Sequence, residues 1–231
     1  STAHRTLEDW CYGFPELWED GEERVRRAKK IAVPGCHASG FIALVLPLIE
    51  SGLISPSLRL SCFSLTGYSG GGKKMIAQYE SSPRDPLLDA PRQYGIGQNH
   101  KHLKEMQRIT GLRTAPVFCP IVADFYSGME VTVPLFAQDL QPGKGMEDVR
   151  EAYRRKYRAL PVVFAEGTDE EGFLSASAFS GKDSMQLSVF GNAERMLLTA
   201  RYDNLGKGAS GAAIECMNLA IGAEKTRALV F

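Results

Sequence analysis

The amino-acid sequence predicts an α+β fold, a mixed and mostly antiparallel sheet with helices packed on one face. Apolar runs with helical spacing stand between shorter segments in which apolar and polar residues alternate. The strand-like segments come in neighbouring pairs, as expected of antiparallel strands. With 231 residues and 44% hydrophobic content, the chain can bury a core of ordinary size.

The first elements are short and lead to a long apolar helix. Residues 1–20 have the character of loop and turn, and a charged helix is expected at residues 20–30. A brief buried strand at residues 31–33 ends at Pro34-Gly35. From Cys36 an apolar run with helical spacing continues to Gly52, a residue type that commonly ends helices.

The remaining elements alternate between strands and helices. Residues 59–66 read as a strand, and a glycine-rich loop at residues 67–72 leads into a helix at residues 73–80. A loop rich in Pro and Asp follows. Further strands are expected at residues 115–123, 128–137, 161–164, 185–191 and 195–202, with a helix at 146–158 and a small-residue helix starting near Gly208. We place the main domain at residues 33–203 and expect the ends on either side to belong to a different domain.

Charge and hydropathy argue against two classes of partner. The chain carries 27 Lys+Arg and 27 Asp+Glu, so it lacks the basic excess of most nucleic-acid-binding proteins. Basic runs at residues 24–30 and 154–158 lie among acids and read as solvated helix faces. The longest apolar stretch, residues 41–49, is far shorter than the roughly 20 residues that a membrane helix needs. The polar opening STAHR is not a signal peptide, and without Met it is expected to be a start within a longer protein or a trimmed chain.

The five cysteines indicate a reducing compartment. They are odd in number and scattered, and no CxxC pair occurs, so the sequence predicts neither a disulfide framework nor a zinc knuckle. A cytoplasmic location fits this usage best.

The first segment with chemical potential is Pro34-Gly35-Cys36-His37-Ala38-Ser39-Gly40. A cysteine in the first turn of an apolar helix faces unpaired backbone N–H groups and the positive end of the helix dipole. Both effects favour the thiolate and hence a nucleophile. The alternative is a small buried residue in the core, the commonest environment of a free cysteine.

The second segment is Asn99-His100-Lys101-His102-Leu103-Lys104-Glu105. Histidine suits proton transfer near neutral pH, and a nearby carboxylate can fix its tautomer. The HxH spacing is also a metal-ligand pattern, but no third and fourth ligands are evident. A surface loop that happens to contain histidines is the third interpretation.

The third and fourth segments are rich in glycine. Residues 67–74 (GYSGGGKK) nearly match a P-loop, but Lys74 stands where the magnesium-binding hydroxyl is required. Backbone N–H groups at the start of a helix, together with Lys73, still form a suitable anion site. Residues 203–211 (DNLGKGASG) permit the close approach of a ligand or of another element. The alternatives are a flexible turn and a helix-packing turn, respectively.

Taken in order, these four segments resemble the N-acetyl-gamma-glutamyl-phosphate reductases of arginine biosynthesis, especially the shorter subtype. The opening STAHR and YGFPEL match as well, so the resemblance covers nearly the whole chain. It implies a fold like the catalytic domain of the glyceraldehyde-3-phosphate and aspartate-semialdehyde dehydrogenases. It also implies NADP as cofactor, a small acyl phosphate as substrate, and a homodimer or homotetramer.

The resemblance also assigns roles to residues by position. Cys36 is implied as the nucleophile and His100 as the acid/base; His102 also stays open as the group that moves the proton. The implied substrate-binding residues are Ser69, Gly70, Lys73, His102 and Glu105, and the implied cofactor-binding residues are Pro34, Gly35, Asn204 and Gly206. The Cys36 thiolate would attack the acyl phosphate to give a thioester, which a hydride from NADPH then reduces.

Three features depart from the family pattern. Val33 stands where the family usually has Asn, and His37 stands where an aromatic residue often follows the cysteine; His37 adds a possible cation beside the thiolate. The N-terminal dinucleotide-binding unit is absent from the sequence, and the GxG at residues 95–97 lacks a βαβ setting. Residues 1–32 are therefore expected to be the end of that nucleotide-binding domain, 33–203 the catalytic and dimerisation domain, and 204–231 a helix returning to the first.

Two other functions stay open at this point. The chain can be a non-catalytic dimerisation module derived from the reductase family. It can also be a cysteine hydrolase that uses Cys36 and His100, since a thioester without a hydride donor can only be hydrolysed. An aminoadipyl or carrier-linked acyl phosphate is an alternative substrate.

Overall fold

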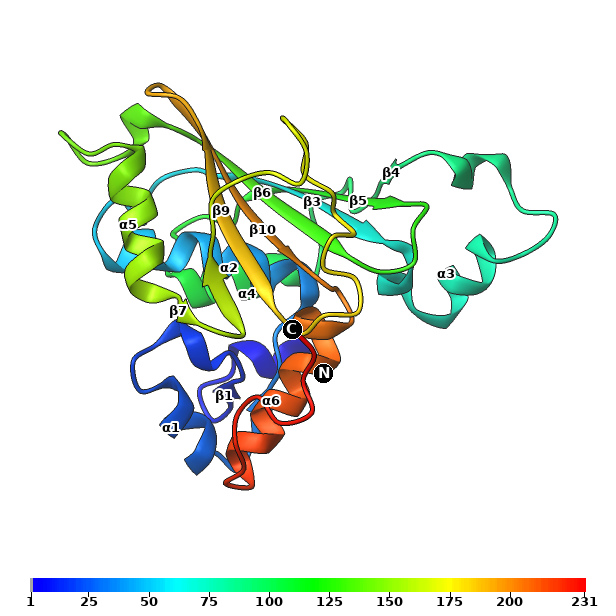
Figure 1. Cartoon of the computed structure of the whole chain (residues 1–231), viewed down its shortest axis with the longest axis horizontal. Helices are drawn as coiled ribbons and strands as arrows, with labels where there is room; N and C mark the ends of the chain where they lie inside the picture. The colour runs from blue at the N-terminus through cyan, green and yellow to red at the C-terminus, as the bar shows by residue number, and fades with distance from the viewer. Residues whose placement is uncertain (1) are drawn as a thin grey trace.

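A single eight-stranded sheet organises the molecule, as the computed structural model of residues 2–231 shows (Figure 1). The strand order is β4-β5-β3-β6-β10-β9-β8-β7. Among the paired strands, β3–β5 and β8–β9 are parallel and the other neighbours are antiparallel, which confirms the predicted mixed sheet. The strands are β3 (Ser61–Gly67), β4 (Arg92–Gln93), β5 (Val117–Ala123), β6 (Met129–Phe136), β7 (Arg158–Ala159), β8 (Val162–Phe164), β9 (Met185–Gly191) and β10 (Arg195–Tyr202).

The larger helices cover one face of this sheet, as predicted. They are α2 (Cys36–Glu50), α4 (His102–Thr110) and α5 (Met146–Lys156). α2 packs on β6 and β10, and α5 packs on β8 and β9. Side chains alternate between the faces, so Phe63 and Leu197 remain exposed while Ser64 and Leu198 are buried. α3 (Gly72–Tyr79) lies on an arm that projects from the β4 end of the sheet (Figure 1).

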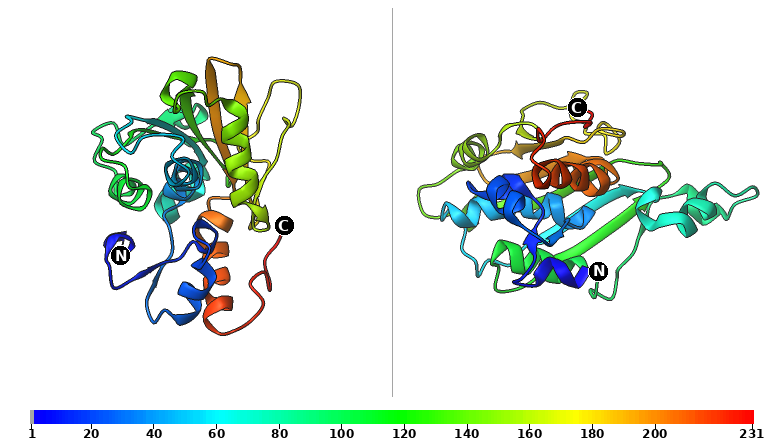
Figure 2. Two further views of the ribbon diagram at one scale, coloured as in Figure 1. Left: turned by 90° about the vertical axis from the view of Figure 1, so that its left-hand side faces the viewer. Right: turned by 90° about the horizontal axis from the view of Figure 1, so that it is seen from below.

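The N-terminal and C-terminal segments of the chain pack against each other below the sheet (Figure 2). There β1 (Cys11–Tyr12) pairs in parallel with β2 (Ile31–Ala32), and α1 (Gly21–Arg27) packs against α6 (Gly211–Ala220). Val25, Cys216 and Leu219 form a small hydrophobic cluster there, separate from the main core. The domain boundaries at residues 32 and 204 stay a prediction.

Most of the elements expected from the sequence are present with small shifts at their ends. β9 and β10 have the predicted bounds, and the helix expected at residues 73–80 is α3. The sequence did not predict α4, which starts inside the histidine segment. All five cysteines are free thiols. Within residues 2–231, no helix has both the length and the apolar character to cross a membrane.

α2 is the centre of the core because every residue from His37 to Leu48 is buried. Such a helix must satisfy all its backbone groups inside the protein. Pro47 has no N–H to give to the carbonyl of Ala43, four residues earlier. The hydroxyl of Tyr157 donates to that carbonyl at 2.8 Å, and the hydroxyl of Tyr153 donates to the Leu44 carbonyl at 2.7 Å.

The first turn of α2 contains a third tyrosine contact. The hydroxyl of Tyr202, at the end of β10, donates to the carbonyl of Cys36 at 2.6 Å and accepts from the N–H of Gly40 at 3.0 Å. In a regular α-helix these two backbone groups would bond to each other. The inserted hydroxyl thus fixes the first turn of the helix to the sheet.

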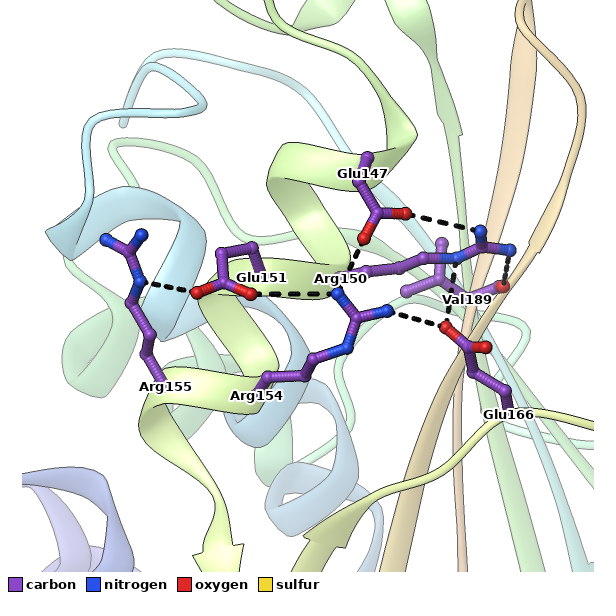
Figure 3. A network of polar contacts seen from close by, with 7 residues as sticks. All are labelled: Glu147, Arg150, Glu151, Arg154, Arg155, Glu166 and Val189. Carbon is purple, nitrogen blue, oxygen red and sulfur yellow. Dashed lines mark hydrogen bonds and ion pairs between the residues drawn. The ribbon is translucent and has the colours of Figure 1, made fainter.

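A surface network of ion pairs attaches α5 to the sheet (Figure 3). Arg154 contacts Glu147 and Glu166 at 2.6 and 2.7 Å, and Arg150 donates to the carbonyl of Val189 in β9 at 3.2 Å. The side chains of Arg154 and Glu166 are 40% and 54% exposed, so solvent screens these ion pairs and each contributes little to stability. The network therefore orients α5, whereas the buried tyrosines provide the stronger attachment.

Tyr157→Phe is expected to lower the free energy of unfolding by about 1–3 kcal/mol, because it leaves the buried Ala43 carbonyl without a donor. Urea unfolding followed by circular dichroism measures the change.

The matched control is Pro47→Ala, which restores a backbone N–H opposite the same carbonyl. In the Pro47→Ala background, Tyr157→Phe should cost clearly less. An equal cost in both backgrounds would show that the hydroxyl does not serve the proline-freed carbonyl.

Candidate active site

A pocket of about 540 Å³ opens at the N-terminus of α2. Four segments that are far apart in the sequence line it: residues 33–37, the glycine-rich turn, the histidine segment and the start of the C-terminal region. Arg5 from the N-terminal segment completes the wall. The structure therefore brings together the four segments that the sequence analysis selected.

Cys36 is the first residue of α2 and lies half-buried on the pocket wall. The preceding Gly35 leaves no room for a side chain, because a Cβ there would lie 2.2 Å from Nε2 of His102. The N–H of Gly35 donates to Oε1 of Glu105 at 2.9 Å. This bond fixes the turn that carries the cysteine.

The thiol of Cys36 is not pre-ionised as the sequence analysis expected. Burial raises the pKa of Cys36, and the backbone N–H of His37 with the charges of Lys101 and Arg5 only partly offsets that effect. The helix terminus acts in the predicted direction, but desolvation of the thiolate outweighs it. Reaction at Cys36 therefore requires a base that accepts its proton.

Three histidines surround the cysteine. The ring centroids of His100 and His102 are 4.7 Å apart, and the ring of His37 lies 5.7 and 5.6 Å from them. Burial lowers the pKa of His37 to about 3 and that of His102 to about 2. His37 is therefore neutral, and the cation expected beside the cysteine is a wrong prediction. Residues 2–231 contain no group of three or more His, Cys, Asp or Glu side chains arranged to hold a metal ion.

His100 differs from the other two histidines because it is only partly buried and lies on the rim of the pocket. Burial, and then the charge of Lys101, lowers its pKa. Its Nδ1 accepts a hydrogen bond from the backbone N–H of His102 at 3.2 Å. Of the three, His100 is the one best suited to exchange protons near neutral pH.

Glu105 lies behind the pocket wall and does not line it. Besides the N–H of Gly35, it accepts from the hydroxyl of Tyr12 at 2.8 Å and pairs with Arg5 at 3.3 Å. Burial raises its pKa, while Arg5 and these hydrogen bonds act against that rise. Its geometry is that of a residue that supports the Cys36 turn, rather than one that contacts a ligand.

The glycine-rich turn forms the opposite wall. Ser69 and Gly70 line the pocket, and Oγ of Ser69 accepts from Nδ2 of Asn204 at 2.9 Å. Lys73 is exposed at the start of α3 and does not line the pocket. Lys73 therefore lies outside the cysteine pocket, whereas Gly71 and Gly72 at the start of α3 line it.

The C-terminal segment contributes Asn204 and the start of η6 (Gly206–Ser210). Gly208 packs directly on Cys36, since a Cβ there would lie 3.2 Å from Cβ of that residue. Gly206 instead faces the backbone of Lys182, where a Cβ would lie 2.1 Å from the carbonyl oxygen. Pro34 and Gly35 line the pocket. Gly206 is thus a packing glycine in this structure and is absent from the pocket lining.

Sequence reasoning missed Arg5, Tyr12 and Tyr94 as parts of the site. Arg5 and Tyr12 lie within STAHR and YGFPEL, segments that resembled the reductases without any role being assigned to a residue. No spacing pattern connects Tyr94 to Cys36. Only the fold brings the three side chains to this region.

A buried ion cluster holds η6 beside Cys36. Nζ of Lys207 contacts Oε2 of Glu16 at 2.9 Å and Oε2 of Glu215 at 2.5 Å. Burial raises the pKa of Glu215 to about 8 although Lys207 opposes the rise, and the charge of Glu16 adds to it. For Glu16, burial is the largest single effect and raises the pKa, but Lys207, the hydrogen bond with Glu215 and the charge of Lys225 together outweigh it and lower the pKa. Glu215 therefore retains a proton at neutral pH.

Comparison with known proteins places this site in a class. Residues 36–204 match the family model described as "Semialdehyde dehydrogenase, dimerisation domain". The fold is also that of aspartate semialdehyde dehydrogenase II from Vibrio cholerae, with a TM-score of 0.68, 17% identity, and coverage of 94% of this chain and 70% of that one. The class is thus a catalytic and dimerisation domain of the semialdehyde dehydrogenase type.

Comparison with related sequences identifies the family more specifically. The chain is 41% identical over 229 residues to the N-acetyl-gamma-glutamyl-phosphate reductase of Rhizobium meliloti (strain 1021), covering 96% of this chain and 74% of that protein. It is 39% identical over 238 residues to N-acetyl-gamma-glutamyl-phosphate reductase 2 of Nostoc sp. (strain PCC 7120 / SAG 25.82 / UTEX 2576), with 96% and 73% covered. The chain belongs to the N-acetyl-gamma-glutamyl-phosphate reductase family.

The titration of Glu215 predicts a pH-dependent stability. Because its pKa is raised on folding, its contribution is fully present below pH 4.5 and is lost as pH rises toward about 8. The slope in this window is at most about 1.4 kcal/mol per pH unit. Urea unfolding at several pH values measures it.

Glu215→Gln keeps a hydrogen-bond donor and removes the titration. The variant should match the parent chain near pH 5, be more stable near pH 8, and lose the decline between those values. If the free energy of unfolding of the variant declines with pH as it does in the parent chain, a group other than Glu215 causes the decline.

Proposed function

We propose that this chain carries the acyl-transfer site of an NADP-dependent reductase that converts N-acetyl-gamma-glutamyl phosphate into its semialdehyde. The observation that carries the proposal is Cys36 on the wall of a pocket, beside a partly exposed His100, in a member of this family. One pocket thus contains two components that nucleophilic catalysis requires, a thiol and a histidine that can act as its base.

In the first step the sulfur of Cys36 attacks the carbonyl carbon of the acyl phosphate. The S–C bond forms, the C–O bond to phosphate breaks, and phosphate leaves. His100 takes the thiol proton, because the strongly lowered pKa values of His37 and His102 make those two rings poor proton acceptors. When bound, NADPH supplies the hydride that reduces the thioester. The C–S bond then breaks, and His100 returns the proton to sulfur.

Arg5 is the proposed partner of the phosphate group. Its guanidinium lines the pocket, held by Nε donating to the Val33 carbonyl at 2.8 Å and by Nη1 at 3.3 Å from Glu105. An arginine fixed in this way can present its remaining N–H groups to phosphate oxygens. Lys101 adds positive charge on the same rim.

The nicotinamide end of NADP fits the side of the pocket formed by η6. The absence of a side chain at Gly208 leaves the backbone there in direct contact with Cys36, and Leu205, Ala209 and Ala213 continue this small, apolar wall. Pro34 and Gly35 flank the other side of the cysteine. We propose these residues, together with Asn204, as the cofactor contacts; Gly206 would act only through packing.

The proposal extends to the setting of the enzyme. Residues 1–32 and 204–231 would adjoin a nucleotide-binding domain, a view supported by their packing on each other through α1 and α6. The chain would act in arginine biosynthesis, in a reducing cytoplasm that keeps Cys36 a thiol, and as a homodimer or homotetramer. The dimerisation family model and the exposed sheet face with Phe63 and Leu197 support an oligomer.

The two alternative functions differ from this proposal in one step. A dimerisation module would form no thioester, and a cysteine hydrolase would turn over acyl groups with water. Acetyl phosphate is a useful probe because its reaction with Cys36 needs no hydride donor.

The parent chain is expected to release a burst of about one phosphate per chain from acetyl phosphate without cofactor, and Cys36→Ser should abolish the burst. His100→Asn should slow it about 10²-fold or more, since the raised pKa leaves the thiol dependent on a base. Stopped-flow phosphate detection measures both.

Cys119→Ser is the matched control, because this cysteine lies on β5 and does not line the pocket. A burst that survives in Cys36→Ser would exclude the proposed nucleophile. Continuous rapid phosphate release without a burst would favour the hydrolase.

Arg5→Met should raise the KM for phosphate in the oxidative direction, assayed with N-acetylglutamate semialdehyde and NADP, by about 10- to 100-fold. Arg5→Lys should restore part of the loss because it keeps the charge. Arg108→Met, which removes an exposed arginine outside the pocket, is the control and should leave KM unchanged. An unchanged KM in Arg5→Met would assign the phosphate to other groups.

A further inference from the structure

His37 connects two residues that the proposed reaction has not used. Its Nδ1 lies 2.6 Å from Oγ of Ser64, and its Nε2 lies 2.6 Å from the hydroxyl oxygen of Tyr94. The ring is buried, and edge contact with Phe118 at 5.3 Å helps to fix its plane. Tyr94 lines the pocket together with Cys36, whereas Ser64 lies on β3 with no exposed surface.

The imidazole of His37 must be neutral in this position. Burial, followed by the charges of His100 and Lys101, lowers its pKa to about 3. A neutral imidazole carries one proton, so one ring nitrogen donates and the other accepts. Two arrangements are possible, and they send the hydroxyl proton of Tyr94 in opposite directions.

Ser64 decides between the two arrangements. In the described part of the chain, its hydroxyl has His37 as its one hydrogen-bond partner. If Nδ1 carried the proton, Ser64 would accept it and its own proton would be buried without an acceptor, a costly state. If Ser64 donates to Nδ1, the buried hydroxyl of Ser64 and both ring nitrogens of His37 are satisfied, and the imidazole proton lies on Nε2.

With the proton on Nε2, His37 donates to the oxygen of Tyr94. The O–H of Tyr94 is then not used by His37 and is free to turn toward the pocket. In the opposite tautomer that proton would bond to Nε2, and Tyr94 would present no donor to the pocket. Ser64 thus determines the direction of the hydrogen bond between His37 and Tyr94.

We propose, building on the proposed acyl-transfer function, that Ser64 and His37 orient Tyr94 as the hydrogen-bond donor to the negatively charged oxygen that forms when Cys36 attacks an acyl phosphate. Tyr94 is the catalytic residue of this arrangement, and His37 and Ser64 are positioning residues. The tyrosine keeps its proton throughout and stabilises the oxyanion by a hydrogen bond, so no bond to its oxygen forms or breaks.

The surroundings of Tyr94 support this role. Burial first, and then the nearby Cys36, raises the pKa of its phenol, so it stays protonated and able to donate. Its ring lies 6.1 Å from the rings of both His37 and His100, so the tyrosine lies beside both the positioning histidine and the proposed base. A donor preorganised for the oxyanion is worth on the order of 10²–10³ in rate.

The direct test is the tautomer of His37, read from long-range proton–nitrogen NMR spectra of the chain labelled with ¹⁵N-histidine and assigned by comparison with His37→Asn. The expected result is a proton on Nε2, with Nδ1 unprotonated. Ser64→Ala should shift the equilibrium toward the proton on Nδ1. A proton on Nδ1 in the parent chain would overturn the proposal.

The kinetic test uses the burst of phosphate release from acetyl phosphate. Tyr94→Phe should slow the burst about 10²-fold, and Ser64→Ala about 10-fold. Both variants should leave the pH dependence of Cys36 alkylation by iodoacetamide unchanged, because alkylation forms no oxyanion. Tyr126→Phe, on an exposed tyrosine outside the pocket, is the control and should match the parent chain.

The outcomes separate this proposal from the proposed function. A parent chain without a burst would contradict acyl transfer, while the NMR spectrum would still decide the direction of the His37 hydrogen bonds. A normal burst in Tyr94→Phe, or an equal loss of alkylation rate, would overturn the role of Tyr94 and leave acyl transfer by Cys36 intact.

Discussion

The burial of α2 is the constraint on which the rest of the structure depends. A helix with no exposed residue from His37 to Leu48 has to satisfy its backbone within the core. Tyr153, Tyr157 and Tyr202 do this from α5 and β10, elements that flank the helix. The N-terminus of the helix is thereby held at one position, and that position is the wall of the pocket. Fixed placement of Cys36 follows from core packing, before any contact with a ligand.

The same burial determines the chemistry that the cysteine can perform. Desolvation raises the pKa of the thiol and keeps two of its three histidine neighbours neutral. The site therefore has a protonated thiol at Cys36, one partly exposed histidine, and Arg5 and Lys101 in its lining. Such an environment favours attack on an anionic acyl phosphate, whose charge the rim can balance. The buried cluster at Lys207 keeps the Gly208 wall in place on the other side.

Features that depend on the local amino-acid pattern could be predicted from the sequence. The alternation in β9 and β10, the apolar run of α2 and the mixed sheet were predicted, as was the meeting of Cys36 and His100 through family resemblance. Properties set by packing were not readable. The position of Lys73 outside the pocket, the neutral state of His37, and the approach of Arg5 and Tyr94 depend on side chains distant in sequence. Desolvation in particular leaves no pattern in the local sequence. For this reason the sequence predicted a thiolate at Cys36, whereas burial raises the pKa of that thiol.

Acyl transfer through Cys36 is tested most directly by identifying the residue that becomes acylated. The chain is mixed with acetyl phosphate, quenched in acid, digested with trypsin and analysed by mass spectrometry. Residues 31–59 form one tryptic peptide, in which Cys36 is the sole cysteine. If Cys36 carries the acyl group, a hydroxylamine-sensitive acetyl group is expected on this peptide and none on the peptides with the other four cysteines. An acetyl group elsewhere, or no labile acetyl group at all, would contradict acyl transfer through Cys36.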